Sequence, residues 1–178
     1  VIFDYTGPYA AGGSEPGAVG TKIAIDMINE RGGVEGHMLK AIYADAQSKV
    51  EVAINEAERL LSQEKVDLLM GLYSSGQCVP LAAKVDARKK FMWANICVSS
   101  AVFKNRNLKY VFRCQVHSDT YGLVSPDFIA HYAKERFGKD PKDIRVAIIH
   151  EDGPYGAGIA SGNVVGAKAH GMKIVLKE

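Results

Sequence analysis

The stretch VEVAINEAERLLSQEKVDLLMGLYSSG, residues 50–76, contains the pattern that decides the fold. Its first half places apolar residues three and four positions apart, which predicts an amphipathic helix over residues 50–61. Residues 66–70 are mostly apolar and predict a short strand, and residues 71–76 have the serines and glycines of a turn. A helix, a buried strand and a turn in this order form the repeating unit of an α/β protein.

The same unit recurs on both sides of this stretch. Because the strand segments are almost continuously apolar rather than alternating, we expect a parallel sheet covered by helices on both faces. Right-handed crossover connections then make the sheet doubly wound, in the manner of a Rossmann-like lobe. The predicted strands are residues 1–4, 38–45, 66–70 and 91–96, and the predicted helices are residues 18–31, 50–61 and 80–89.

The rhythm breaks over residues 97–120 and then restarts as a second α/β unit. We therefore expect residues 1–117 to form a ligand-binding lobe that lacks its first strand residues and its returning segment, and residues 118–178 to begin an incomplete second lobe. The strand patterns at both ends are abrupt, so we expect the chain to be part of a longer protein. The break contains a short strand candidate at 110–113, and the second unit is predicted to contain helices at 121–137 and 155–170 and strands at 145–149 and 172–176.

Composition excludes several classes of function. The 22 basic and 20 acidic residues are spread along the chain, so the net charge of +2 gives no electrostatic case for nucleic acid. No apolar run approaches the roughly 18 to 20 residues of a membrane span. The three cysteines, Cys78, Cys97 and Cys114, show no CxxC spacing, which disfavours a zinc or thioredoxin site, and an odd number indicates no disulfide framework.

Ligands of parallel sheets bind beyond the carboxyl ends of the strands, where helix amino termini present free N–H groups. Two neighbouring loops of this kind contain serines: Ser74 and Ser75 in residues 71–77, and Ser99 and Ser100 in residues 97–102. A serine there can simply cap the helix, but it can also donate to a carboxylate. Two such loops side by side favour a binding site. The long glycine-rich loop of residues 5–17, with Tyr9 in its middle, is expected to cover it.

Enzyme chemistry is difficult to assemble from this chain. Residues 150–158, HEDGPYGAG, resemble a dinucleotide fingerprint, but the spacing is GxxGxG rather than GxGxxG and a proline interrupts it. No histidine pair has metalloprotease spacing and no GxSxG elbow is present. His150 beside Glu151 and Asp152 is the best acid–base candidate, but simple solvation of these side chains at the surface is the favoured interpretation. We expect no cofactor, no metal and no catalytic residue.

The motifs in these loops are similar in order and spacing to those of the periplasmic leucine/isoleucine/valine-binding family, the type I substrate-binding proteins of ABC transporters. The resemblance covers the whole chain. It rests on residues 4–8 (DYTGP), 24–36 (AIDMINERGGVEG), 43–47 (YADAQ), 71–80 (GLYSSGQCVP) and 145–158 (RVAIIHEDGPYGAG).

The resemblance implies a protein without enzymatic activity, which holds a ligand in a cleft between two lobes that close by a hinge. By position, Ser75 matches the family's carboxylate-binding serine, Cys97 and Ser99 match a loop that touches the ligand, and Tyr155 matches the tyrosine that closes over it. Gln47 and Ser74 stand near the positions of the family's first-lobe disulfide, so that bridge is absent. The full set of predicted ligand-binding residues is Tyr9, Ser74, Ser75, Cys97, Ser99 and Tyr155.

The expected function is therefore that of an extracytoplasmic solute-binding protein of an ABC importer. Its ligand is a small carboxylate, either a branched-chain or other amino acid or an aromatic acid, because residues 95–99 (NICVS) depart from the family's small-residue run. Permease subunits are the expected partners, and the expected location is periplasmic, or membrane-anchored in a Gram-positive host, with a signal peptide in the precursor. The alternatives are a ligand-sensing regulatory module of the same fold and a nucleotide-dependent enzyme.

Overall fold

The computed structural model describes all of residues 1–178, and the chain forms two compact units. Unit 1 comprises Val1–Cys97 and Arg106–Gln115, and unit 2 comprises Val98–Asn105 and Val116–Glu178. The chain thus passes between the units three times. The lobe boundary of the whole protein stays a prediction.

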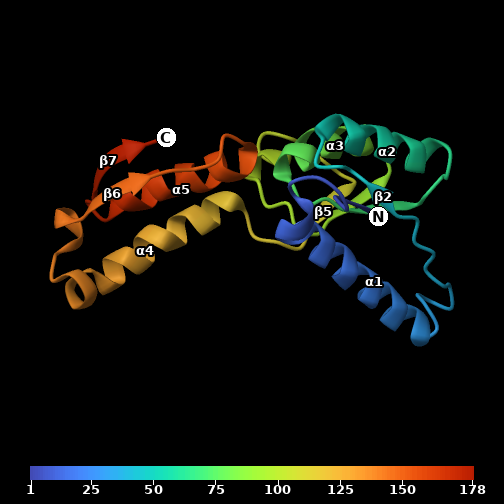
Figure 1. Ribbon diagram of the computed structural model, residues 1–178, viewed down its shortest axis with the longest axis horizontal. Helices are drawn as coiled ribbons and strands as arrows, with labels where there is room; N and C mark the ends of the chain where they lie inside the picture. Colours follow the sequence, from blue (N-terminus) through green and yellow to red (C-terminus); the bar gives the residue numbers. More distant parts are fainter. The chain divides into compact units, whose positions relative to one another are not determined.

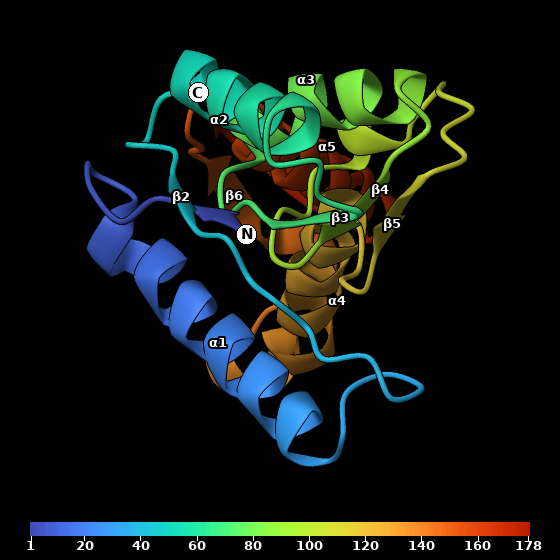
Figure 2. The same cartoon turned by 90° about the vertical axis from the view of Figure 1, so that its right-hand side faces the viewer.

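Unit 1 is a five-stranded sheet with helices on both faces. The strands run in the order β2-β1-β3-β4-β5 and every adjacent pair is parallel. Helices α2 and α3 lie on one side of the sheet and α1 lies on the other (Figures 1 and 2). This confirms the predicted doubly wound parallel sheet. The elements are β1 (Ile2–Phe3), η1 (Ala10–Ser14), α1 (Glu15–Glu30), β2 (Ala44–Asp45), α2 (Val50–Ser62), β3 (Leu68–Gly71), α3 (Ser75–Ala87), β4 (Phe91–Ala94) and β5 (Val111–Arg113).

The apolar stripe of α2 explains how this layer forms. Its buried residues are Ala53, Ala57, Leu60 and Leu61, all from the predicted stripe, and the helix packs against α3 and β1. On the opposite face Phe3 is fully buried against Ala18 of α1. Full burial of a side chain such as Leu60 or Phe3 stabilises the fold by roughly 1.5–3 kcal/mol.

Two elements of unit 1 differ from the predictions. The strand predicted for residues 38–45 is reduced to Ala44–Asp45, because both backbone groups of Leu39 bond to the side-chain amide of Asn29 in α1 instead of to a strand. Helix α3 begins at Ser75 rather than near Pro80, because Ser74 caps the amino terminus and the proline is accommodated inside the helix.

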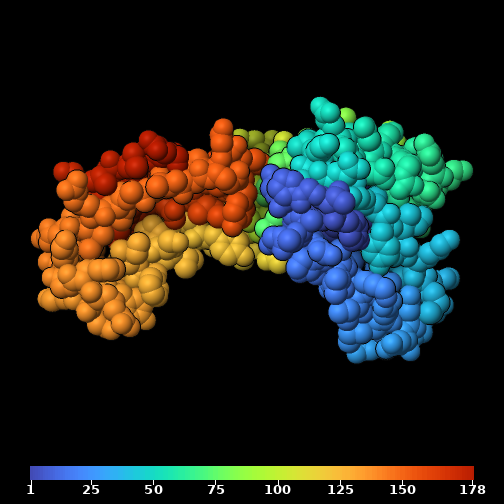
Figure 3. Space-filling model, viewed as in Figure 1, coloured from blue at the N-terminus to red at the C-terminus, as the bar shows by residue number.

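Unit 2 is built on two long helices that pack along each other, visible as adjacent surfaces from yellow to red-orange in Figure 3. Their close approach depends on glycine, since a side chain at Gly122 or Gly162 would collide with the backbone of the opposite helix. Strands β6 and β7 are parallel. The elements are η2 (Ser100–Val102), α4 (Ser118–Phe137), η3 (Pro141–Asp143), β6 (Arg145–Ile148), α5 (Pro154–Ala169) and β7 (Lys173–Lys177). None of the helices in the chain combines the length and hydropathy that a membrane span requires.

Candidate functional site

The amino terminus of α3 carries the two serines predicted from residues 71–77. Strand β3 ends at Gly71, and the Ser74 hydroxyl accepts a hydrogen bond of 3.2 Å from the backbone N–H of Gly76, so Ser74 is the helix cap. Ser75 is the first residue of the helix and is 3% exposed. The positive dipole end of this 13-residue helix therefore lies beside a serine hydroxyl. This combination suits a carboxylate.

A pair of tyrosines belongs to the same edge of unit 1. Tyr9 is 40% exposed, and its ring lies 6.2 Å from that of Tyr73, which immediately precedes the capping serine. The Tyr73 hydroxyl donates to the carbonyl of Gly12 at 3.5 Å, and the Tyr73 ring occupies the space that a side chain at Gly13 would need. Sequence reasoning missed Tyr73, although its place between a strand end and the two serines was a usable signal.

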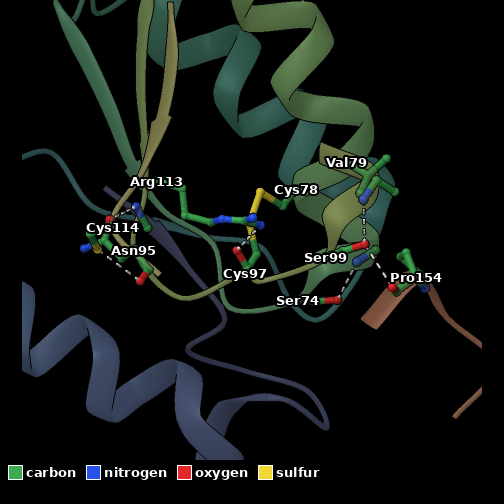
Figure 4. Close-up of a disulfide and its surroundings, with 12 residues drawn as sticks. Ser74, Cys78, Val79, Asn95, Cys97, Ser99, Arg113, Cys114 and Pro154 are labelled. Carbon is green, nitrogen blue, oxygen red and sulfur yellow. Dashed lines mark hydrogen bonds between the residues drawn. A yellow bond between two sulfur atoms is a disulfide. The ribbon is translucent and has the colours of Figure 1, made fainter. Parts of the chain in front are cut away.

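Cys97 forms a disulfide with Cys78 of α3, with the Cα atoms 6.4 Å apart (Figure 4). The expectation that the cysteines form no disulfide is therefore wrong. Both sulfur-bearing residues are buried, and the carbonyl of Cys97 accepts a hydrogen bond of 3.3 Å from Arg113. The Cys97 side chain ties α3 to the loop after β4, and its predicted contact with a ligand stays a prediction. Cys114 is an exposed free thiol.

Asp45 holds the beginning of the loop that contains Tyr9. Its carboxylate accepts hydrogen bonds from the backbone N–H groups of Tyr5, Thr6 and Gln47 and from the Thr6 hydroxyl, the last at 2.7 Å. Partial burial acts to raise the pKa of Asp45, but these hydrogen bonds, that of the Thr6 hydroxyl foremost, together hold the pKa below its ordinary value.

This lowered pKa predicts a pH-dependent contribution to stability. An aspartate with a depressed folded pKa stabilises the protein above its unfolded pKa of about 3.9, and the stabilisation is lost as the pH falls through the folded value. We expect Asp45→Asn to lower the free energy of unfolding at pH 7, with a difference from wild type that shrinks as the pH falls below 4. Urea unfolding at several pH values measures it. A difference that does not change with pH would contradict this role.

The predicted residues of unit 2 come together at the start of α5. The Ser99 hydroxyl donates to the carbonyl of Pro154 at 2.9 Å and accepts from the backbone N–H of Ala101 at 3.2 Å. Ser99 is 1% exposed, so its hydroxyl fixes the loop against the helix (Figure 4). Tyr155, the next residue after Pro154, is 47% exposed and available to a ligand. Tyr9, Ser74, Ser75 and Cys97 lie in unit 1, and Ser99 and Tyr155 lie in unit 2.

The glycines at the start of α5 leave room for an acidic side chain of the same chain. Glu151 accepts a hydrogen bond of 2.8 Å from the backbone N–H of Gly156, and side chains at Gly153 or Gly156 would collide with it. A dinucleotide pyrophosphate needs the same helix amino terminus. Because the carboxylate already occupies it and repels a second anion, the arrangement opposes nucleotide binding.

A helix amino terminus with serines at the carboxyl edge of a parallel α/β sheet is the place where proteins of this fold class bind small ligands. The sequence profile of the periplasmic binding protein family matches residues 1–178, so the chain belongs to this family. The family consists of substrate-binding proteins of transporters and not of enzymes. This confirms the resemblance drawn from the sequence.

Relatives agree with this assignment. A Leu/Ile/Val-binding protein homolog 7 of Brucella suis is 30% identical over 177 residues, which are 99% of this chain and 44% of the relative. A second relative is the branched-chain amino acid transporter substrate-binding protein of Streptococcus pneumoniae, in complex with isoleucine, with a TM-score of 0.81 and 22% sequence identity. The alignment covers 99% of this chain and 47% of the S. pneumoniae chain. A solute-binding protein of R. palustris, in complex with 4-hydroxybenzoate, has a TM-score of 0.78 and 24% sequence identity. The alignment covers 99% of this chain and 45% of the R. palustris chain. The two structures show the fold, and the chain spans less than half the length of these proteins.

Proposed function

We propose that this chain is part of an extracytoplasmic solute-binding protein of an ABC importer and that it binds the carboxylate group of a small organic acid. The observation that carries this proposal is the amino terminus of α3. There Ser74 fixes the helix start, so that the Ser75 hydroxyl and the positive dipole end of the helix are placed to bind an anion. Charge-assisted hydrogen bonds of this kind are about twice as strong as neutral ones.

The rest of the ligand meets aromatic side chains. Tyr9 and Tyr73 provide ring surfaces with polar ends, which suit an aromatic ring or a branched aliphatic group. The R. palustris protein is in complex with 4-hydroxybenzoate and the S. pneumoniae protein with isoleucine, which supports both ligand classes. Tyr155, which is exposed on unit 2, stays a predicted ligand contact. The proposed ligand is thus an aromatic acid or a branched-chain or other amino acid.

Membership of the family supports the wider role. A protein of this kind works outside the cytoplasm, in the periplasm or, in a Gram-positive host, anchored to the outer face of the cytoplasmic membrane, and delivers its ligand to the permease subunits of the transporter. These partners and this location follow from the family and belong to the proposal.

A thermal-shift panel on the full-length protein tests the function. We expect at least one acid from a panel of branched-chain amino acids and hydroxylated benzoates to raise the Tm, because a ligand at 100 times its Kd stabilises the folded state by about 2.7 kcal/mol. Benzyl alcohol and isoamylamine, which lack the carboxylate, are the controls and should give no shift. A shift with NAD and none with any acid would contradict the proposal.

A further inference from the structure

Asp4 follows β1 and is completely buried. One of its carboxylate oxygens accepts hydrogen bonds of 2.7 Å from the backbone N–H of Ser48 and of 2.7 Å from the side-chain amide of Gln77. The other accepts a hydrogen bond of 3.2 Å from the Ser14 hydroxyl, which itself accepts from the Asp4 backbone N–H at 2.6 Å. All of these donors are neutral, so the buried carboxylate is stabilised by hydrogen bonds rather than by an ion pair.

The three donors come from three separate segments at the carboxyl edge of the sheet. Ser14 ends the turn that follows the Tyr9 loop, Ser48 lies in the loop after β2, and Gln77 is the third residue of α3, two positions after Ser75. The chain then extends the network, because the Ser48 hydroxyl accepts a hydrogen bond of 2.9 Å from the backbone N–H of Tyr9. Asp4 therefore connects the loop that contains Tyr9 with the amino terminus of α3.

The network fixes these segments at an energetic cost. The oxygen of the Gln77 side chain is buried without a partner, because its amide nitrogen must face Asp4. Ser48 has a φ of 56°, in the left-handed region that residues with a side chain rarely adopt. Strain and unpaired polar groups persist where the surrounding structure over-determines them, and they gather at functional sites.

We propose that Asp4 is a positioning residue of the ligand site, which holds the Tyr9 loop and the first turn of α3 in one arrangement before a ligand arrives. Its effect on affinity rests on the proposed function. Its effect on the two segments does not, and it is measurable without ligand. Preorganisation of this kind improves affinity because less ordering remains to occur on binding.

The test compares three variants of the full-length protein. Asp4→Ala removes all the hydrogen bonds of the carboxylate. Asp4→Asn keeps an oxygen that accepts from Ser48 and Gln77. Asp86→Ala is the matched control, because the Asp86 carboxylate accepts two hydrogen bonds of 2.7 Å, from the backbone N–H groups of Lys109 and Tyr110, and bonds no site segment. Amide hydrogen exchange is followed without ligand, and titration calorimetry uses 4-hydroxybenzoate and L-leucine as probes.

We expect Asp4→Ala to speed exchange in residues 5–9 and 75–78 and to raise the Kd of the bound probe by at least about ten-fold, because binding must then order both segments. The Kd of Asp4→Asn should stay within about three-fold of the wild-type Kd, because the asparagine keeps an oxygen that accepts hydrogen bonds. Asp86→Ala should lower stability but change neither the Kd nor exchange in these two segments. If Asp4→Ala does not fold, Gln77→Met replaces it as the test. This variant removes the hydrogen bond from α3 to Asp4 and should speed exchange in residues 75–78.

Unchanged exchange in both segments, or equal loosening by Asp86→Ala, would overturn the positioning role and leave Asp4 as a general stabilising residue. Binding of neither probe by the wild type, together with the expected exchange result, would count against these two acids as ligands and not against Asp4. Faster exchange with an unchanged Kd would show that the segments do not determine affinity and would also overturn the proposal.

Discussion

Ser75→Ala in the full-length protein is expected to raise the Kd for its carboxylate ligand by roughly 10 to 150-fold. A hydrogen bond to a charged group contributes about 1.5–3 kcal/mol, and each 1.4 kcal/mol corresponds to a factor of ten in Kd. Ser75 begins α3 and is almost completely buried, so loss of its hydroxyl removes a donor where little water can replace it. Titration calorimetry with the acid that gives the largest thermal shift measures the effect.

Two further serine variants separate binding from stability. Ser62→Ala removes a hydroxyl that bonds only within α2, to the carbonyl of Glu58, and should change neither Kd nor Tm appreciably. Ser74→Ala removes the α3 cap and should lower stability by about 1 kcal/mol. An unchanged Kd for Ser75→Ala would exclude Ser75 from the site.

The second large effect concerns the Cys78–Cys97 disulfide. The bond closes a loop between residues 19 positions apart. A disulfide that closes a loop of about this length stabilises the folded state by roughly 3 kcal/mol, because it lowers the entropy of the unfolded chain. The double variant Cys78→Ser, Cys97→Ser should therefore unfold at a lower urea concentration, by this free energy.

Cys114→Ser is the matched control for the disulfide variant. This thiol is exposed and its one hydrogen bond, to the carbonyl of Asn95, is long at 3.8 Å, so the change should alter stability by less than about 0.5 kcal/mol. Equal stability of the double variant and wild type would show that the bond does not form in the native protein.

Much of the fold was predictable because burial imposes a period on the sequence. The stripe from Ala53 to Leu61 specified α2, and the apolar runs at residues 66–70 and 91–96 specified adjacent strands of a parallel sheet. The start of the candidate site was predictable for a related reason. In a parallel sheet the residues after neighbouring strands must meet at one edge, so the serines of residues 71–77 were recognisable before their geometry was known.

The remaining features depend on contacts between distant residues, which no local pattern contains. Cys78 and Cys97 meet because α3 packs beside the end of β4, and their spacing alone gives no hint of a bond. Residues 38–43 have strand-like side chains, yet Asn29 captures the backbone of Leu39. The three donors of Asp4 are separated from it by 10 to 73 positions.

The most direct test is a crystal structure of the full-length protein with the acid that gives the largest thermal shift. We expect the ligand carboxylate to lie about 2.7–3.0 Å from the Ser75 hydroxyl and from a backbone N–H of the first turn of α3, with the other end of the ligand against Tyr9 or Tyr73. A ligand carboxylate bound elsewhere, with no contact to the first turn of α3, would contradict it.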